Sequence, residues 1–85
     1  DPQMFEAQRN LGNVLSQQGK IDEALESFGR ALEVAPGDAL THNNLGVVLL
    51  QKGEIDEAVR HFSEALKIDP TYRAAQENID RVQSR

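Results

Sequence analysis

Residues 11–36 read LGNVLSQQGKIDEALESFGRALEVAP, and residues 45–70 read LGVVLLQKGEIDEAVRHFSEALKIDP. The second stretch begins 34 positions after the first, and residues 5–38 align with residues 39–72 at fifteen identities in thirty-four positions without a gap. Pro2, Pro36 and Pro70, the three prolines of the chain, keep the same spacing. Self-similarity at a fixed period of about 20–50 residues is typical of repeat proteins. The sequence therefore predicts a repeat array.

The size and composition of the chain limit the kinds of protein it can be. Its 85 residues predict one domain over residues 1–85, and a hydrophobic share of 39% with 27% charged residues is typical of an ordered soluble domain. No apolar run approaches the ~20 residues of a membrane span. The net charge of −5 disfavours nucleic acid or an anionic membrane as a partner. The absence of cysteine excludes a disulfide framework or a thiolate metal site, and it favours a reducing compartment such as the cytoplasm.

Apolar residues recur at spacings of three and four, which predicts amphipathic helices. Five helices are expected, over about residues 3–18, 22–35, 39–52, 56–69 and 72–84. Gly19 and Gly53 are expected to end the first and third helices in the left-handed conformation, and Asp22 and Asp38 to cap the second and third.

Short turns between successive helices predict antiparallel helical hairpins. Gly12 and Gly46 lie inside helices, where glycine is unfavourable, so we expect the backbone of the hairpin partner to pass close by, with Ala24 and Ala58 opposite them. The last helix repeats only the opening of the unit and has a polar back, as expected of a cap that closes a helical array. The arrangement is thus two repeats, about 5–38 and 39–72, followed by a capping helix at about 72–84.

The repeated residues resemble the signature of the tetratricopeptide repeat (TPR) family. The residues that carry the resemblance, each with a partner 34 positions on, are Leu11, Gly12, Leu15, Gly19, Ala24, Phe28, Ala31 and Pro36. Two signature aromatics are absent: Gln8 and His42 stand at an early one, and Leu15 and Leu49 at a later one. The resemblance implies an all-α, right-handed α-solenoid whose first helices line a concave groove. It also implies a non-catalytic scaffold that binds an extended peptide or a partner's helix in that groove.

If the first helix of each hairpin faces the groove, the residues off its buried stripe contact the ligand. The predicted peptide-binding residues are Arg9, Asn10, Asn13, Leu40, Asn43, Asn44, Val47, Leu50, Asn78 and Arg81. Asn10, Asn44 and Asn78 recur once per period and are expected to form a ladder, because a side-chain amide both donates to and accepts from a peptide backbone. The alternative is that asparagine at this position is a consensus choice that serves structure only. The ladder alone is too weak for tight binding, so the apolar residues Leu40, Val47 and Leu50 are expected to add specificity.

Some members of the family bind a C-terminal carboxylate through a clamp of basic residues and asparagines. Arg9, Asn13 and Asn44 resemble the first part of that clamp in spacing, but Ala74 and Asn78 stand where further basic residues are needed. A carboxylate bound without them lacks its strongest charge-assisted hydrogen bonds. The arginines of the groove helices still favour an acidic or mixed peptide.

Nothing in the sequence indicates an enzyme, a cofactor or a metal site. His42 and His61 are expected on different hairpins as ordinary surface or packing residues, and no set of His, Asp and Glu has metal-binding spacing. The serines lack the context of a nucleophile, and there is no glycine-rich phosphate loop.

Two hypotheses therefore remain for the role of the chain. The first is a protein-interaction scaffold with a peptide or protein partner. The second is a self-associating structural fragment, a natural excerpt or an engineered one, with no ligand of its own. The second rests on an apolar face formed by Met4, Phe5 and Leu11 at the N-terminal end, through which copies could form a homo-oligomer. Asp1-Pro2 matches Asp69-Pro70 in phase, which favours an excerpt from a longer array over a plain start with proline in the first turn.

Overall fold

The computed structural model describes residues 4–84, which form five α-helices and no strand. The helices are α1 (Met4–Gln17), α2 (Ile21–Val34), α3 (Ala39–Lys52), α4 (Ile55–Ile68) and α5 (Arg73–Gln83). None of these five helices combines the length and the apolar character needed to cross a bilayer. The all-α fold expected from the sequence is confirmed. The predicted helix start at Gln3 and the Asp1-Pro2 pair lie outside the described residues.

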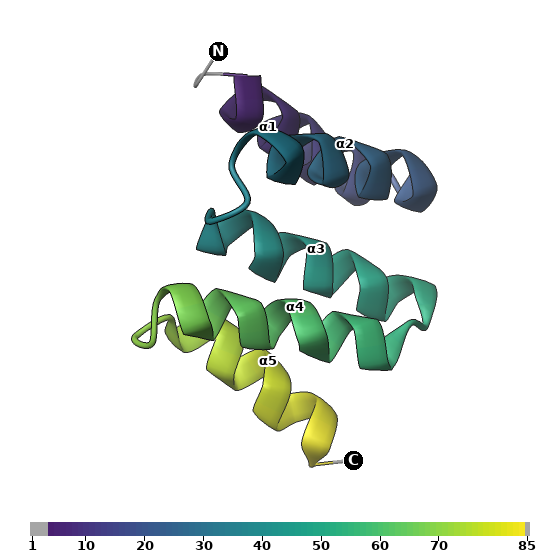
Figure 1. Ribbon diagram of the computed structural model, residues 1–85. Coiled ribbons are helices and arrows are strands. Elements are labelled where there is room, and N and C mark those ends of the chain that lie inside the picture. The colour runs from purple at the N-terminus through teal and green to yellow at the C-terminus, as the bar shows by residue number, and fades with distance from the viewer. Residues whose placement is uncertain (1–3, 85) are drawn as a thin grey trace.

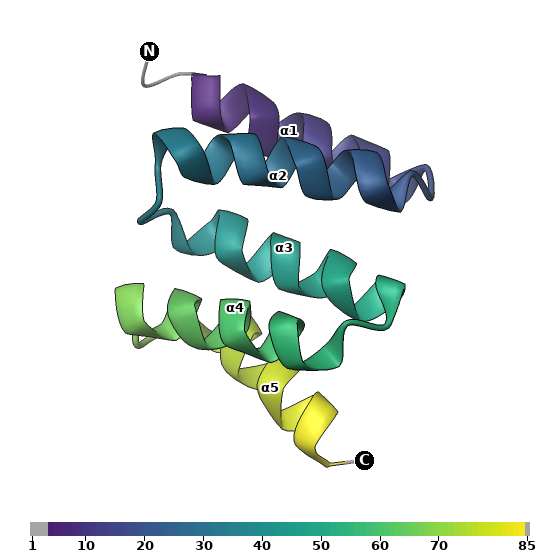
Figure 2. The same ribbon diagram turned by 45° about the vertical axis from the view of Figure 1, so that its right-hand side comes forward.

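The helices form a single stack with α1 at one end and α5 at the other (Figure 1). Within the stack α1 pairs with α2 and α3 pairs with α4, while α2 packs on α3 and α4 packs on α5. Turning the view shows the same succession of layers (Figure 2). The first helices also contact one another, α1 with α3 and α3 with α5, whereas α2 and α4 do not meet anywhere in residues 4–84. Successive layers therefore lie closer together on the side of α1, α3 and α5 than on the side of α2 and α4.

Each hairpin turn is closed by a glycine in the left-handed conformation. Gly19 and Gly53 have φ of 80° and 91°. After Gly19, the N–H of Lys20 donates to the carbonyl of Leu15 at 2.9 Å and that of Gly19 to Ser16 at 3.1 Å, the two bonds of a Schellman motif. The glycine stop expected at both positions is confirmed.

The prediction that Asp22 caps the second helix is wrong. The turn is so short that Lys20 both ends the Schellman motif and stands as the N-cap of α2, without a side-chain hydrogen bond. Asp22 consequently lies in the first turn of α2, where its charge still opposes the positive end of the helix dipole. Asp38, by contrast, caps α3 as predicted, because its carboxylate accepts from the backbone N–H of Thr41 at 3.3 Å.

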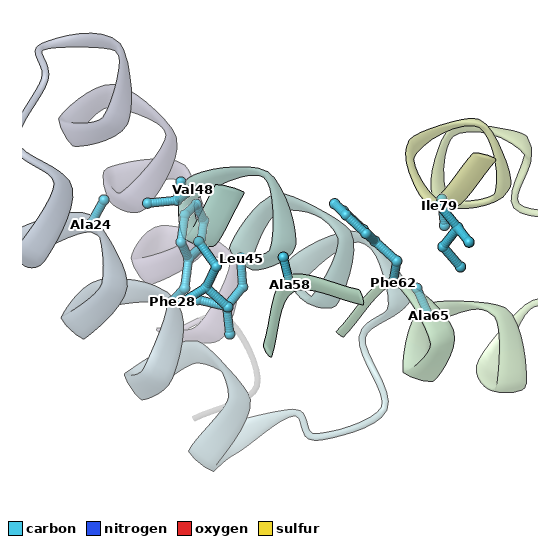
Figure 3. Packing of buried hydrophobic residues seen from close by; sticks show 10 residues of the cluster. Ala24, Phe28, Leu45, Val48, Ala58, Phe62, Ala65 and Ile79 are labelled. Atoms are coloured by element: carbon cyan, nitrogen blue, oxygen red, sulfur yellow. The ribbon is translucent and has the colours of Figure 1, made fainter. Parts of the chain in front are cut away.

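The core of each hairpin is a buried phenylalanine packed over a helical glycine. Phe28 and Phe62 are both 0% exposed. A Cβ atom added to Gly12 would lie 2.7 Å from the Phe28 ring, and one added to Gly46 would lie 2.5 Å from the Phe62 ring. The expectation that these glycines admit the partner backbone is therefore wrong, since an aromatic ring occupies the space. The two rings belong to one cluster with residues of the following first helices, such as Leu45 and Ile79 (Figure 3).

The outer face of α1 differs from the equivalent face of α3. Leu11 and Val14 are 45% and 49% exposed, whereas Leu45 and Val48, one period later, are only 7% and 2% exposed. The face of α3 is covered because α2 packs against α3. Among the described residues, no helix covers α1 in the same way.

Candidate peptide-binding face

The outward side of the first helices carries three rows of residues at matching positions. In α3 the row is Leu40, Asn44 and Val47, whose spacings of four and three place them on one stripe. One period earlier the row is Glu6, Asn10 and Asn13, and one period later it is Ala74, Asn78 and Arg81. We call these nine residues the first-helix face. All nine are exposed or half-buried.

The middle row of the first-helix face is the apolar one. Leu40 and Val47 are 40% and 36% exposed, and the half-buried Asn44 lies between them on the stripe. Leu50, the third predicted apolar contact, is instead partly buried and packs against the core cluster. The surface available to a ligand on α3 is therefore a pair of aliphatic side chains flanking one amide.

Arg9 is held by a contact between layers. Its Nη1 donates to Oδ2 of Asp38 at 2.9 Å, and the pair is largely sheltered from solvent. The guanidinium also lies over the ring of Phe5, 5.8 Å from its centroid, within the range of a cation–π contact. The same oxygen of Asp38 accepts from the hydroxyl of Thr41. Arg9 thus fastens α1 to the start of α3.

These contacts lower the pKa of the Asp38 carboxyl. Burial by itself raises the pKa of Asp38, but the hydrogen bonds from Thr41 and Arg9 and the charge of Arg9 outweigh it, so the pKa lies below its ordinary value. Asp38 therefore neutralises Arg9 at physiological pH. A ligand carboxylate would have to compete with Asp38 for this arginine, which weakens the expectation of an acidic peptide.

Asn43 and Asn78 are also brought together, across the next layer. The Asn78 side-chain amide donates to Oδ1 of Asn43 at 3.0 Å, and Asn43 is only 7% exposed. Asn43 is therefore a bridge between α3 and α5. The three asparagines predicted as a ladder are less alike than expected: Asn10 is exposed, Asn44 is half-buried, and Asn78 already uses one of its N–H groups within the protein.

The sequence predicted Asp38 as a helix cap but did not predict its pairing with Arg9, because the repeat contains no matching pair of charges. Asn43 lies one period after Arg9, and Tyr72 lies one period after Asp38. Burial raises the pKa of Tyr72, and the side chain of Asn43 acts in the opposite direction. The equivalent positions of the second repeat therefore carry no ion pair.

The two histidines are close together, contrary to expectation. His42 on α3 and His61 on α4 belong to the same hairpin, and their Nδ1 atoms are 3.0 Å apart. They border an open cavity of about 560 Å³ along α4 that none of the predicted peptide-binding residues lines. The sequence did not predict this contact, because the two residues are 19 positions apart and only the register between α3 and α4 brings them together.

The family of the chain follows from its sequence. A family model described as "Tetratricopeptide repeat" matches residues 3–71. The chain belongs to the TPR family. Members of this family are generally non-catalytic interaction modules. No curated protein sequence matches the chain.

Solved TPR structures share the fold. The structure of MamA matches with a TM-score of 0.93 and 24% identity, over 99% of this chain and 49% of that one. The second TPR of Spaghetti (RPAP3), bound to the HSP90 peptide SRMEEVD, matches with a TM-score of 0.93 and 22% identity, over 98% and 77%. YrrB, a TPR protein with an unusual peptide-binding site, matches with a TM-score of 0.86 and 30% identity, over 89% and 39%. The chain thus spans about half the length of the MamA chain and less of the YrrB chain.

Proposed function

We propose that the chain is a non-catalytic scaffold that holds an extended or helical peptide segment of a partner protein on the first-helix face. The observation that carries the proposal is the exposed pair Leu40 and Val47 in the middle row, set between rows that contain Asn10 and Asn78. Apolar side chains provide the burial, and side-chain amides can bond a peptide backbone in either direction.

Two further observations support this location. Contacts run between α1, α3 and α5 but not between α2 and α4, so a curved stack of this kind has its hollow on the side of the first helices. Among similar structures, the Spaghetti domain is bound to a peptide and YrrB is described as having a peptide-binding site. Because Arg9 is paired with Asp38, we propose that apolar contacts, more than charge, determine which segment binds.

The size of the apolar contribution follows from the exposed area. Truncating Leu40 and Val47 to alanine removes five carbon atoms. The two residues are 40% and 36% exposed, so a ligand can bury a little over a third of the surface of these side chains. At about 0.8 kcal/mol for each fully buried CH₂ group, the double variant loses roughly 1.5 kcal/mol, or about tenfold in affinity.

The experiment is a peptide-library screen with the wild-type chain, followed by affinity measurements on the best peptide. The Leu40→Ala/Val47→Ala variant is compared with Ile55→Ala/Ile68→Ala, which truncates aliphatic residues of similar exposure (42% and 39%) on α4. We expect the first variant to bind about tenfold more weakly and the second to bind normally. Equal losses in both, or a loss only in the α4 variant, would place the ligand elsewhere and defeat the proposal.

A second candidate is self-association through the outer face of α1. The specific observation is that Leu11 and Val14 are open while their counterparts on α3 are covered by α2. Sedimentation equilibrium over a concentration series tests it: we expect dimers that Leu11→Glu returns to monomers. A wild-type chain that stays monomeric at every concentration rules this candidate out.

A further inference from the structure

The two histidines of the chain form a pair with defined hydrogen bonds. No other histidine occurs in the 85 residues. The ring centroids of His42 and His61 are 5.3 Å apart with an interplanar angle of 25°, and the Nδ1 atoms are 3.0 Å apart. On its other side, Nε2 of His42 lies 2.9 Å from the carbonyl oxygen of Pro36. His42 is buried, whereas His61 is half-buried.

These contacts determine where the ring protons are. A carbonyl oxygen can only accept, so Nε2 of His42 carries a hydrogen and donates it to Pro36. In the neutral ring, Nδ1 of His42 is then bare and accepts the hydrogen of Nδ1 of His61. The pair therefore has one hydrogen between two ring nitrogens and one bare nitrogen, Nε2 of His61.

We propose that His42 and His61 are a two-nitrogen binding site for a divalent transition-metal ion of the imidazole-preferring kind, with Zn²⁺ as the reference ion. Imidazole nitrogen bonds zinc at about 2.0–2.1 Å, so two nitrogens on one ion at angles of roughly 90–109° lie about 2.9–3.4 Å apart. The observed Nδ1 separation of 3.0 Å falls within that range. In the structure the two Nδ1 atoms face each other across a hydrogen bond, so binding requires the ring of the half-buried His61 to swing out of this position until both lone pairs point at the ion.

The surroundings of the pair fit this use. Histidines that bind metals usually donate their second ring N–H to a carbonyl or carboxylate, and His42 does so to Pro36. His61 borders the open cavity of about 560 Å³, which gives an ion a path from solvent. The cavity is also lined by two carboxylates, Glu57 and Glu64, and by two basic groups, Arg60 and Lys67, so the imidazole nitrogens and not the net charge would hold the ion.

The ligand count limits the kind of site. Within residues 4–84, no three side chains of the metal-binding types are already gathered for one ion. The remaining coordination positions are therefore filled by water, since the carboxylate of Glu64 lies 3.8 Å from Nζ of Lys67 in an ion pair. Such a site is open, unlike a structural zinc site closed by four protein ligands. It lies on the hairpin side of α3, away from the first-helix face, and does not depend on the proposed function.

The proton balance of binding follows from the ring hydrogens. His42 already has the required tautomer, with Nδ1 bare. In His61 the hydrogen leaves Nδ1 to solvent and another adds to Nε2, so two neutral imidazoles bind the ion with no net release of protons. The cavity side of His61 is open enough for this exchange with water.

The test is calorimetric titration of tag-free protein with Zn²⁺, together with NMR of the two imidazole rings. The variants are His61→Ser and His42→Gln, which introduce the residues that the first repeat has at the equivalent positions, Ser27 and Gln8. Circular dichroism confirms that each variant remains folded, and Ser63→Ala serves as a control that lines the same cavity without a ring nitrogen.

We expect one Zn²⁺ per wild-type chain, with the ring signals of both histidines shifting together. Each histidine variant should bind about tenfold more weakly or worse, since losing even an outer-sphere partner of a metal ligand costs about 10–100-fold. Ser63→Ala should bind as the wild type does. Absence of binding overturns the proposal, and so does binding that His61→Ser leaves unchanged, because the ion would then be held by carboxylates alone.

Discussion

Replacing Gly46 by alanine tests the packing of the hairpin most sharply, because two effects of known size oppose each other there. Alanine is favoured over glycine inside a helix by about 1 kcal/mol. The added Cβ, however, would lie 2.5, 2.8 and 2.9 Å from three atoms of the Phe62 ring. Phe62 is fully buried, so its ring cannot move aside into solvent. Inserting a carbon into a packed core typically costs about 1–3 kcal/mol, and contacts this short put the cost at or beyond the upper end.

We therefore expect Gly46→Ala to destabilise the fold by about 2 kcal/mol net, measured by urea unfolding followed by circular dichroism. Gly29→Ala in α2 is the matched control, because no atom lies within 4 Å of its added Cβ. That variant should be more stable than the wild type, by up to about 1 kcal/mol. A Gly46→Ala protein as stable as the wild type would show that Phe62 does not occupy this space and would refute the packing described above.

The other stability predictions concern the interlayer ion pair, the left-handed turn and the aromatic core. The pKa of Asp38 is lowered in the folded state, so its contribution to stability is present above about pH 4 and is lost as the pH falls through the folded pKa. The difference in unfolding free energy between wild type and Asp38→Asn should accordingly be largest near neutral pH and shrink as the pH falls below about 4; a constant difference would contradict the Arg9 pairing. Gly53→Ala should cost about 1 kcal/mol in urea unfolding, because φ is 91° there, and no change would argue against the left-handed turn. Phe28→Ala should cost about 3–5 kcal/mol and leave the chain largely unfolded at 37 °C by thermal melting; a cooperative melt near that of the wild type would contradict its central place in the core.

The sequence predicted those features that depend on local chemistry. Apolar spacings of three and four predicted the five helices, Gly19 and Gly53 predicted the two hairpin turns, and Asp38 predicted a helix cap. Each of these depends on residues a few positions apart, for which conformational rules are strong. Even among these local features the prediction for Asp22 was wrong, because the N-cap rule considers only residue type. It does not take into account that the short preceding turn makes Lys20 the N-cap.

Rules for residues a few positions apart could not predict the contacts between layers. Arg9 meets Asp38 across 29 positions and Asn78 meets Asn43 across 35, so both depend on how the hairpins stack. The prediction assigned Arg9 and Asn43 to the ligand because they lie off the expected buried stripe of their helices, and it did not foresee that each also bonds a residue of another layer. The same limit applies to His42 and His61, which the register of one hairpin brings together.

The most direct test of the proposed peptide-binding face is amide-detected NMR of the ¹⁵N-labelled chain during titration with the selected peptide. The side-chain amides of Asn10, Asn44 and Asn78 give separate signals, one per layer, and Leu40 and Val47 report through their backbone amides. We expect the largest shifts at these five residues and small ones along α2 and α4. If the peptide instead perturbs the second helices and leaves the three asparagines unchanged, the ligand is bound on the opposite side of the stack and the assignment of the face is wrong.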